Sequence, residues 1–155
     1  MVLSKTPDVP HKGWNLHDVV DARDERGLEH GDYESCQFCG KEQIRWVHIL
    51  QHPGYPNMIE VGCNCAEKLT NDYVNPKRRE QELKSRSSRR VRFPAKGWKT
   101  SSKGNPYISH NGKVAVVFGT PSGKFRISID KQIQPKAFST IDEAKMGIFD
   151  IIEPK

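Results

Sequence analysis

The hydrophobic and polar positions between residues 43 and 51 suit a β-strand, in which side chains alternate between two faces. One face carries Ile44, Trp46, His48 and Leu50, and the other carries Arg45, Val47 and Ile49. A turn-forming cluster, Pro-Gly-Tyr-Pro-Asn over 53–57, follows it. Apolar residues over 58–61 then indicate a returning strand. We therefore expect a hairpin, with a helix after it that extends from about Asn64 to Tyr73 and ends before Asn75-Pro76, because the residue before proline avoids the helical region.

The C-terminal part predicts three strands and a helix. Strands over 107–110 and 113–118 flank Asn111-Gly112, a strong hairpin-turn signal. Alternation over 125–129 predicts the third strand. Thr140 and Glu143 form a capping box that begins a final helix. The predicted inward stripe of this helix is Ile141, Ala144, Ile148 and Ile151 or Ile152.

The N-terminal part predicts an arm over 1–13 and then a short helix. Asn15 is a good N-cap, Trp14 can pack on Val19, and Gly27 or Gly31 can end the helix. Residues 1–35 carry four basic and eight acidic groups, so this part is acidic.

From Lys77 to about Ser87 the residues are good helix formers but lack an apolar stripe. The run over 85–90 is typical of a flexible segment. The fold class is therefore α+β: a small zinc finger joined by a basic helix or linker to a three-stranded antiparallel sheet with one C-terminal helix. The expected parts are 1–35 (arm and helix), 36–75 (finger), 76–95 (basic helix or linker) and 96–155 (strand-strand-strand-helix module).

The chain of 155 residues is 35% hydrophobic, which suits one domain or two small ones without a single large core. A run of 18 apolar residues is lacking, so we expect no membrane span. The first residues lack the order of a secretion signal. We therefore expect a cytoplasmic protein, in which paired cysteines more often bind metal than form disulfides.

All four cysteines lie in two pairs, Cys36-x-x-Cys39-Gly40 and Cys63-x-Cys65. Two thiolates and a tight glycine turn are typical of a metal-binding knuckle. We expect one tetrahedral Zn²⁺ site with Cys36, Cys39, Cys63 and Cys65 as ligands, replacing a hydrophobic core locally. Disulfides and free thiols are the alternatives.

The spacing of the second pair leaves the ligand set open. With one residue between them, Cys63 must bind from the strand end and Cys65 from the helix start. If one turns away, His48 or His52 is the natural replacement. We expect His17 and His30 to be exposed.

The order knuckle, hairpin, cysteine pair and helix resembles a treble-clef zinc finger. The phrase Val61-Gly-Cys-Asn-Cys-Ala66 is similar to the hairpin-to-helix junction of fingers in phage and bacterial proteins. This resemblance implies a second ligand pair at a helix N-terminus, where the dipole stabilises thiolates. It implies no known activity.

The C-terminal module loosely resembles the AP2-type and phage-integrase arm-binding folds, with Phe138-Ser-Thr-Ile-Asp-Glu-Ala144 similar to their helix entrance. That resemblance implies a sheet presented to the DNA major groove. With the basic helix included, the order also resembles a double-stranded-RNA-binding domain, although the lysine-rich start of that family's last helix is missing.

Residues 77–92 hold eight basic and two acidic residues, a charge of +6 that equals the net charge of the whole chain. Such a density could neutralise several phosphates, and arginine favours phosphate contacts. Aromatic residues downstream, including Tyr107 and Phe125, lie among lysines as in a stacking surface, although Phe125 also suits a core. The candidate nucleic-acid-binding residues are Lys77, Arg78, Arg79, Lys84, Arg86, Arg89, Arg90, Arg92, Trp98, Lys99, Lys103 and Arg126.

No catalytic residues are recognisable by their spacing, and the glycines suit turns rather than a phosphate-binding loop, so we expect no enzyme and no small-molecule substrate. The expected function is zinc-stabilised nucleic-acid binding, to DNA rather than RNA. The alternative is a non-catalytic protein-interaction module, an adaptor or an inhibitor of a host protein encoded by a phage or mobile element, which grips a partner through residues 14–34 and a sheet edge.

Overall fold

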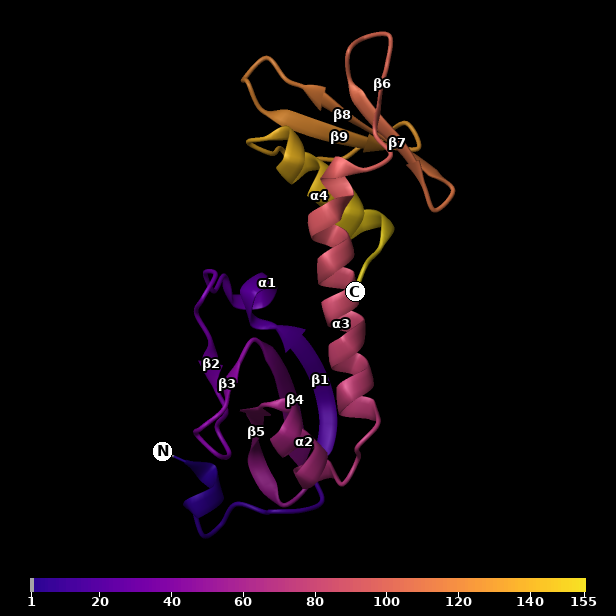
Figure 1. The fold of residues 1–155 in the computed structure, drawn as a ribbon. Coiled ribbons are helices and arrows are strands. Elements are labelled where there is room, and N and C mark those ends of the chain that lie inside the picture. Colours follow the sequence, from indigo (N-terminus) through magenta and orange to yellow (C-terminus); the bar gives the residue numbers. More distant parts are fainter. Residues whose placement is uncertain (1) are drawn as a thin grey trace. The chain divides into compact units, whose positions relative to one another are not determined.

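The computed structural model describes residues 2–155 and divides the chain into two compact units, Met1–Ser85 and Arg86–Lys155 (Figure 1). Each unit has its own antiparallel sheet and its own apolar core. The protein is therefore α+β, as expected. None of the helices in residues 2–155 has the length and apolar character that a membrane crossing needs.

The first unit contains a three-stranded sheet in the order β1-β4-β5 and a separate two-stranded ribbon, β2-β3. Its elements are η1 (Leu3–Lys5), β1 (Asn15–Asp21), α1 (Ala22–Arg26), β2 (Glu34–Ser35), β3 (Gln43–Ile44), β4 (Trp46–His52), β5 (Tyr55–Val61), α2 (Cys63–Thr70) and the first part of α3 (Asn75–Arg92). The predicted β4-β5 hairpin is confirmed. α2 ends earlier than predicted, with Asn71 in the left-handed conformation.

The predicted helix after Asn15 is wrong, because this segment is strand β1, paired antiparallel with β4. Its register shifts between Leu16 and Asp18, as in a β-bulge. The bulge adds one residue and breaks the two-residue period, so Leu16 and Val19 both reach the interior at a spacing of three. That spacing imitates a helical stripe. The helix α1 begins only at Ala22.

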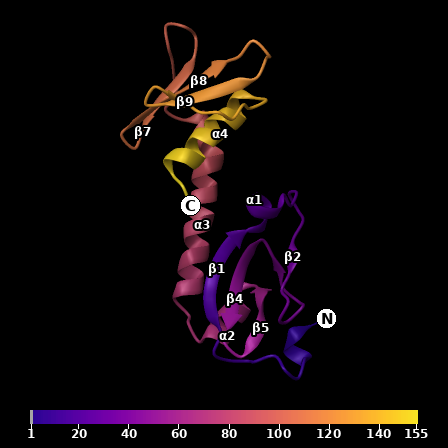
Figure 2. The ribbon, with the colours of Figure 1, turned by 180° about the vertical axis from the view of Figure 1, so that it is seen from behind.

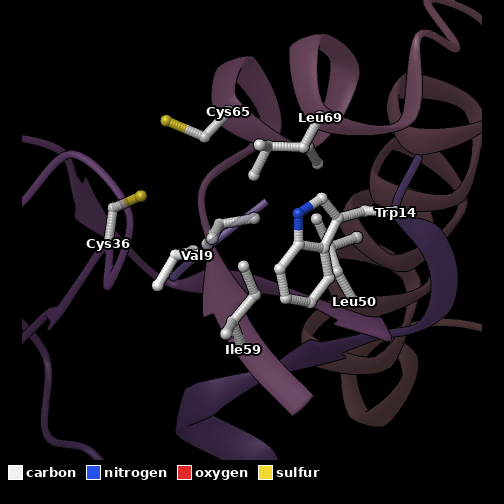
Figure 3. Close-up of a cluster of buried hydrophobic side chains, with 9 residues drawn as sticks. Val9, Trp14, Cys36, Leu50, Ile59, Cys65 and Leu69 are labelled. Atoms are coloured by element: carbon white, nitrogen blue, oxygen red, sulfur yellow. The ribbon is translucent and has the colours of Figure 1, made fainter. Parts of the chain in front are cut away.

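The core of the first unit is apolar and lies between the sheet and α2. Trp14 is buried in it and donates through Nε1 to the Pro10 carbonyl oxygen at 2.8 Å. Figure 3 shows Trp14 among these side chains. The predicted staple of Trp14 on Val19 is wrong because it needs a helix that begins at Asn15, and this segment is strand β1. The buried members are Val9, Trp14, Cys36, Leu50, Ile59, Val61, Cys65, Ala66 and Leu69. The cysteines therefore adjoin a hydrophobic core and do not replace one.

The second unit contains a five-stranded sheet in the order β10-β9-β8-β7-β6, not the three-stranded sheet expected. The three predicted strands are central, and a two-residue strand flanks them on each side. Its elements are the last part of α3, η2 (Phe93–Ala95), β6 (Lys99–Thr100), β7 (Pro106–His110), β8 (Lys113–Gly119), β9 (Phe125–Ile129), β10 (Gln132–Ile133) and α4 (Ile141–Ile152).

Local turn and cap signals of the second unit are confirmed. Asn111 and Gly112 have φ of 48° and 74°, as a type I′ turn needs. The Thr140 side chain accepts from the Glu143 amide at 3.1 Å and caps α4.

α4 packs against β8 and β9, as the reverse view in Figure 2 also shows. Ala144, Ile148 and Phe149 are buried, whereas Ile141 and Ile151 are 37% and 43% exposed. The predicted stripe therefore wrongly included Ile141 and missed Phe149. The Phe149 ring lies 5.4 Å from that of Phe93 in η2, a neighbour brought there only by the fold.

Candidate metal centre

Cys36 and Cys39 lie in a tight turn between β2 and β3. The Gly40 amide donates to the Cys36 carbonyl oxygen at 2.8 Å, and Gly40 has a φ of 69°. Glycine adopts this left-handed conformation without the penalty that a Cβ atom brings. The C-x-x-C-G pattern predicted this turn, and the structure brings both thiols to one side of it.

The second pair lies in the first turn of α2, which begins at Cys63 itself. Residues in a helix are about 100° apart, so side chains two positions apart point about 200° away from each other. Cys65 faces the knuckle, and Figure 3 shows its sulfur and that of Cys36 pointing toward one another. Cys63 therefore cannot face the same centre.

Three cysteines and one carboxylate form the cluster: Cys36, Cys39, Glu42 and Cys65. One potential ligand atom from each lies within 4.8 Å of all the others. The structure thus brings together three of the four predicted ligands and places Cys63 elsewhere. None of the four cysteines is in a disulfide.

Glu42 is a potential ligand that the cysteine pattern did not predict. Its backbone oxygen accepts from the Cys36 amide at 3.0 Å, so it belongs to the knuckle. Its side chain occupies the space that a Cβ atom at Gly62 would need. Two features of the sequence could have indicated a role for Glu42: its position three residues after Cys39, and the glycine just before the C-x-C pair.

The electrostatics of the cluster suit a cation. A hydrogen bond from the Cys65 thiol, then backbone amides of the knuckle, lower the pKa of Cys36, although burial acts in the other direction. The same contact raises the pKa of Cys65. Burial, and then the Cys36 charge, raise the pKa of Glu42. The donors therefore share protons in the metal-free state, and a divalent ion would take the place of those protons.

Cys63 lies in a second cluster with His48 and Glu80, whose potential ligand atoms are again within 4.8 Å of one another. Burial, followed by the carboxylates of Glu80 and Glu67, raises the pKa of Cys63 to about 12. Burial also lowers the pKa of His48. His52 belongs to neither cluster, since its Nδ1 accepts from the Gly54 amide at 2.8 Å. His17 and His30 are exposed, as expected.

The predicted flexible run over 85–90 is helical and forms part of α3. Within the first unit, the basic side chains of α3 form ion pairs with acidic side chains. These pairs are Lys77–Glu67 (3.3 Å), Arg78–Glu82 (3.4 Å), Arg79–Asp18 (2.6 Å) and Lys84–Glu80 (3.7 Å). The basic members are at least 34% exposed in each pair, and exposed pairs contribute little to stability.

Two arginines of α3 in the second unit join α3 to α4. Arg86 and Arg90 both contact the Asp150 carboxylate, at 3.2 and 2.8 Å. Arg86 also donates to the Glu153 carbonyl oxygen at 2.8 Å, and its side chain is only 11% exposed. These two predicted nucleic-acid ligands thus connect α3 to α4 within the second unit.

The remaining predicted binding residues divide into two groups. Trp98 packs against the core and donates to the Phe93 carbonyl oxygen at 2.9 Å, and Arg126 donates to that of Gln134 at 2.8 Å. Arg89, Arg92, Lys99 and Lys103 are exposed.

A hollow of about 360 Å³ lies in the second unit beside Phe93, and Arg89, Arg92, Lys96 and His110 line it. Glu153 lies in the same hollow, 3.4 Å from Arg89 and 3.1 Å from His110. The hollow thus already surrounds one anionic group of the chain with basic side chains. Lys96 was not among the twelve predicted residues.

Comparison of the chain with protein-family models, curated proteins and solved structures gives no match.

Proposed function

We propose that residues 36–75 form a treble-clef zinc finger in which Cys36, Cys39, Glu42 and Cys65 hold Zn²⁺. Three thiolates and a carboxylate suit this borderline-soft ion, which prefers four ligands. The order of knuckle, β4-β5 hairpin and α2 supports the proposal. Four protein donors leave no open position, which favours a structural role over a catalytic one.

We propose further that the protein binds nucleic acid, DNA rather than RNA, through phosphate contacts. The observation that carries this proposal is the hollow lined by Arg89, Arg92 and Lys96. Guanidinium groups form strong, forked hydrogen bonds with phosphate oxygens. The Glu153 carboxylate between Arg89 and His110 occupies a place that suits a phosphate equally well.

Within the first unit, the exposed basic side chains Lys77, Arg78 and Lys84 of α3 offer further phosphate contacts. Their carboxylate partners compete weakly, because exposed ion pairs exchange readily in water. Arg86 and Arg90 are excluded from the surface because they hold Asp150 and the end of α4. Replacing these two would test the fold rather than the binding.

The test is an electrophoretic shift with single- and double-stranded DNA and RNA across a salt series. The variant is the triple change Arg89→Ala, Arg92→Ala and Lys96→Ala, and the matched control is Lys113→Ala, Lys124→Ala and Lys131→Ala, which removes the same charge away from the hollow. We expect the first triple variant to weaken binding and reduce the salt slope by about 0.9 for each lost phosphate contact.

A second variant tests the reverse direction. Glu153→Gln removes the carboxylate from Arg89 and His110, so we expect tighter binding than that of the unaltered chain. Equal effects of the two triple variants, together with no effect of Glu153→Gln, would refute a phosphate site in the hollow.

The alternative, a protein-interaction module, has one specific observation in its favour. The edge strand β5 exposes half of Met58, beside a hollow of about 270 Å³ that Leu3 and Tyr55 also line. Residues 15–21 of the predicted gripping segment form the other edge strand, β1. Partner capture that is lost with Met58→Asp but unchanged by the triple alanine variant would favour this alternative.

A further inference from the structure

Three elements of the first unit bring His48, Cys63 and Glu80 together. His48 comes from β4, Cys63 is the first residue of α2, and Glu80 lies in α3. A ring nitrogen, a sulfur and a carboxylate oxygen lie within 4.8 Å of one another. Imidazole, thiolate and carboxylate are the usual side-chain ligands of Zn²⁺ in proteins.

His48 has the environment of a metal-binding histidine. Its side chain is fully buried, and its Nε2 atom lies 3.3 Å from the Pro76 carbonyl oxygen. A hydrogen bond from one ring nitrogen to a carbonyl oxygen leaves the lone pair on the other. That other nitrogen, Nδ1, is buried and makes no hydrogen bond of ordinary geometry with residues 2–155, although the Trp46 backbone lies close to the ring. Native proteins rarely leave such an atom unpaired, and a metal ion would satisfy it.

The acidic groups around Cys63 also point to a cation. The Cys63 thiol lies 3.6 Å from a carboxylate oxygen of Glu67. Glu67 is buried, with 3% of its surface exposed. Glu67 thus adds a second carboxylate beside this thiol. Lys77 and Lys84 pair with Glu67 and Glu80 at 3.3 and 3.7 Å, but both lysines are largely exposed and reach the carboxylates from outside. A cation between the donors would neutralise the part of the carboxylate charge that the two lysines leave uncompensated.

We propose that His48, Cys63 and Glu80 form a second metal site for a borderline divalent ion such as Zn²⁺ or Co²⁺, with Glu67 or a water molecule as the fourth ligand. The divergence of Cys63 and Cys65 along the first turn of α2 assigns one thiol to each of two separate centres. The proposal depends on this cluster alone and not on nucleic-acid binding.

The test is titration of metal-free full-length protein with Co²⁺, followed by the thiolate-to-cobalt charge-transfer and d–d absorption and by the bound metal per chain. The decisive variant is Glu80→Gln, which keeps size and helix propensity. Its matched control is Glu82→Gln, since Glu82 lies in the same helix and pairs with the exposed Arg78 instead of facing the cluster. Cys39→Ser removes a ligand of the first site instead.

We expect about two Co²⁺ per chain in the unaltered protein and in Glu82→Gln, one for each donor cluster. Glu80→Gln should weaken one of the two binding steps by at least about tenfold and leave the three-thiolate absorption of the first site. Cys39→Ser should weaken the other step, so a failure of the first site is distinguishable from a failure of the second.

Binding of a single Co²⁺ by the unaltered protein at saturation, in a step that Cys39→Ser weakens and Glu80→Gln leaves unchanged, would overturn the proposal. An unchanged second binding step in Glu80→Gln and in Cys63→Ser would also overturn it. Circular dichroism of each variant checks that the fold is kept. If Glu80→Gln fails to fold, the nearly isosteric Cys63→Ser decides, because it should also lose one binding step.

Discussion

The Glu42 carboxylate occupies the space beside Gly62 in which any other residue would carry its Cβ atom. Gly62 has φ of −77° and ψ of 170°, which every residue can adopt. The glycine is thus required for space and not for backbone conformation. Its absent side chain lets an acidic residue of the knuckle reach the Cys65 thiol in the first turn of α2.

Gly62→Ala is therefore expected to displace Glu42 and weaken metal binding at the first site by at least about tenfold, an effect comparable to the loss of a supporting contact. Competition with a chromophoric chelator measures the affinity. The control is Gly119→Ala, because a Cβ atom at Gly119 would meet nothing within 4 Å among the described residues, and the φ of Gly119 is not positive. Equal affinities of the two variants would contradict a ligand role for Glu42.

Removal of the metal by a chelator should loosen the first unit and leave the second unchanged. We expect amides of the knuckle and of the first turn of α2 to lose protection from hydrogen exchange, because the ion connects them. Amides of β4 should keep partial protection, since Leu50 and Val47 are buried in apolar clusters. Loss of protection in β8 as well would contradict independent units.

Gly147→Ala sets two effects of opposite sign against each other. Alanine in place of glycine within a helix stabilises it by about 1 kcal/mol. A Cβ atom at this position of α4, however, would collide with the ring of Phe138. Overpacking of this kind costs about 1–3 kcal/mol, so we expect a lower or at best equal free energy of unfolding. Urea denaturation measures it, and a gain of about 1 kcal/mol would show that Phe138 moves freely.

The start of α3 should contribute a stability that depends on pH. Hydrogen bonds from the Asn75 and Val74 amides, both at 2.9 Å, lower the pKa of Asp72 below its ordinary value of 3.8. A carboxyl group whose folded pKa is lowered stabilises the fold above its unfolded pKa, and this contribution disappears as pH falls through the folded pKa. We therefore expect Asp72→Ala to lower Tm at about pH 6.

The difference in Tm between the unaltered chain and Asp72→Ala is the informative quantity, because all other carboxyl groups are common to both. It should stay constant down to about pH 5 and shrink below about pH 4. A difference that does not depend on pH would assign the effect to backbone propensity and not to the charge of Asp72.

Elements specified by neighbours in the sequence were predictable. The hairpins, the Asn111-Gly112 turn, the Thr140 cap and the Cys36–Cys39 knuckle each depend on a few adjacent residues. Interactions between distant segments were not. The β1 bulge imitated a helical spacing, and the short strands β6 and β10 are too brief for any periodicity to mark them.

The cysteine pattern alone was enough to indicate a metal-binding segment, because two closely spaced pairs of thiols are typical of metal sites. Which thiols share a centre depended on the tertiary structure. The helix begins at Cys63, so its geometry directs Cys63 toward His48 and Glu80 and Cys65 toward the knuckle. Glu42 completes the first cluster only because folding brings it against Gly62, twenty residues away along the chain. The spacing of cysteines in the sequence indicates which residues are potential metal ligands. The packing of strands and helices decides which of these residues share a centre.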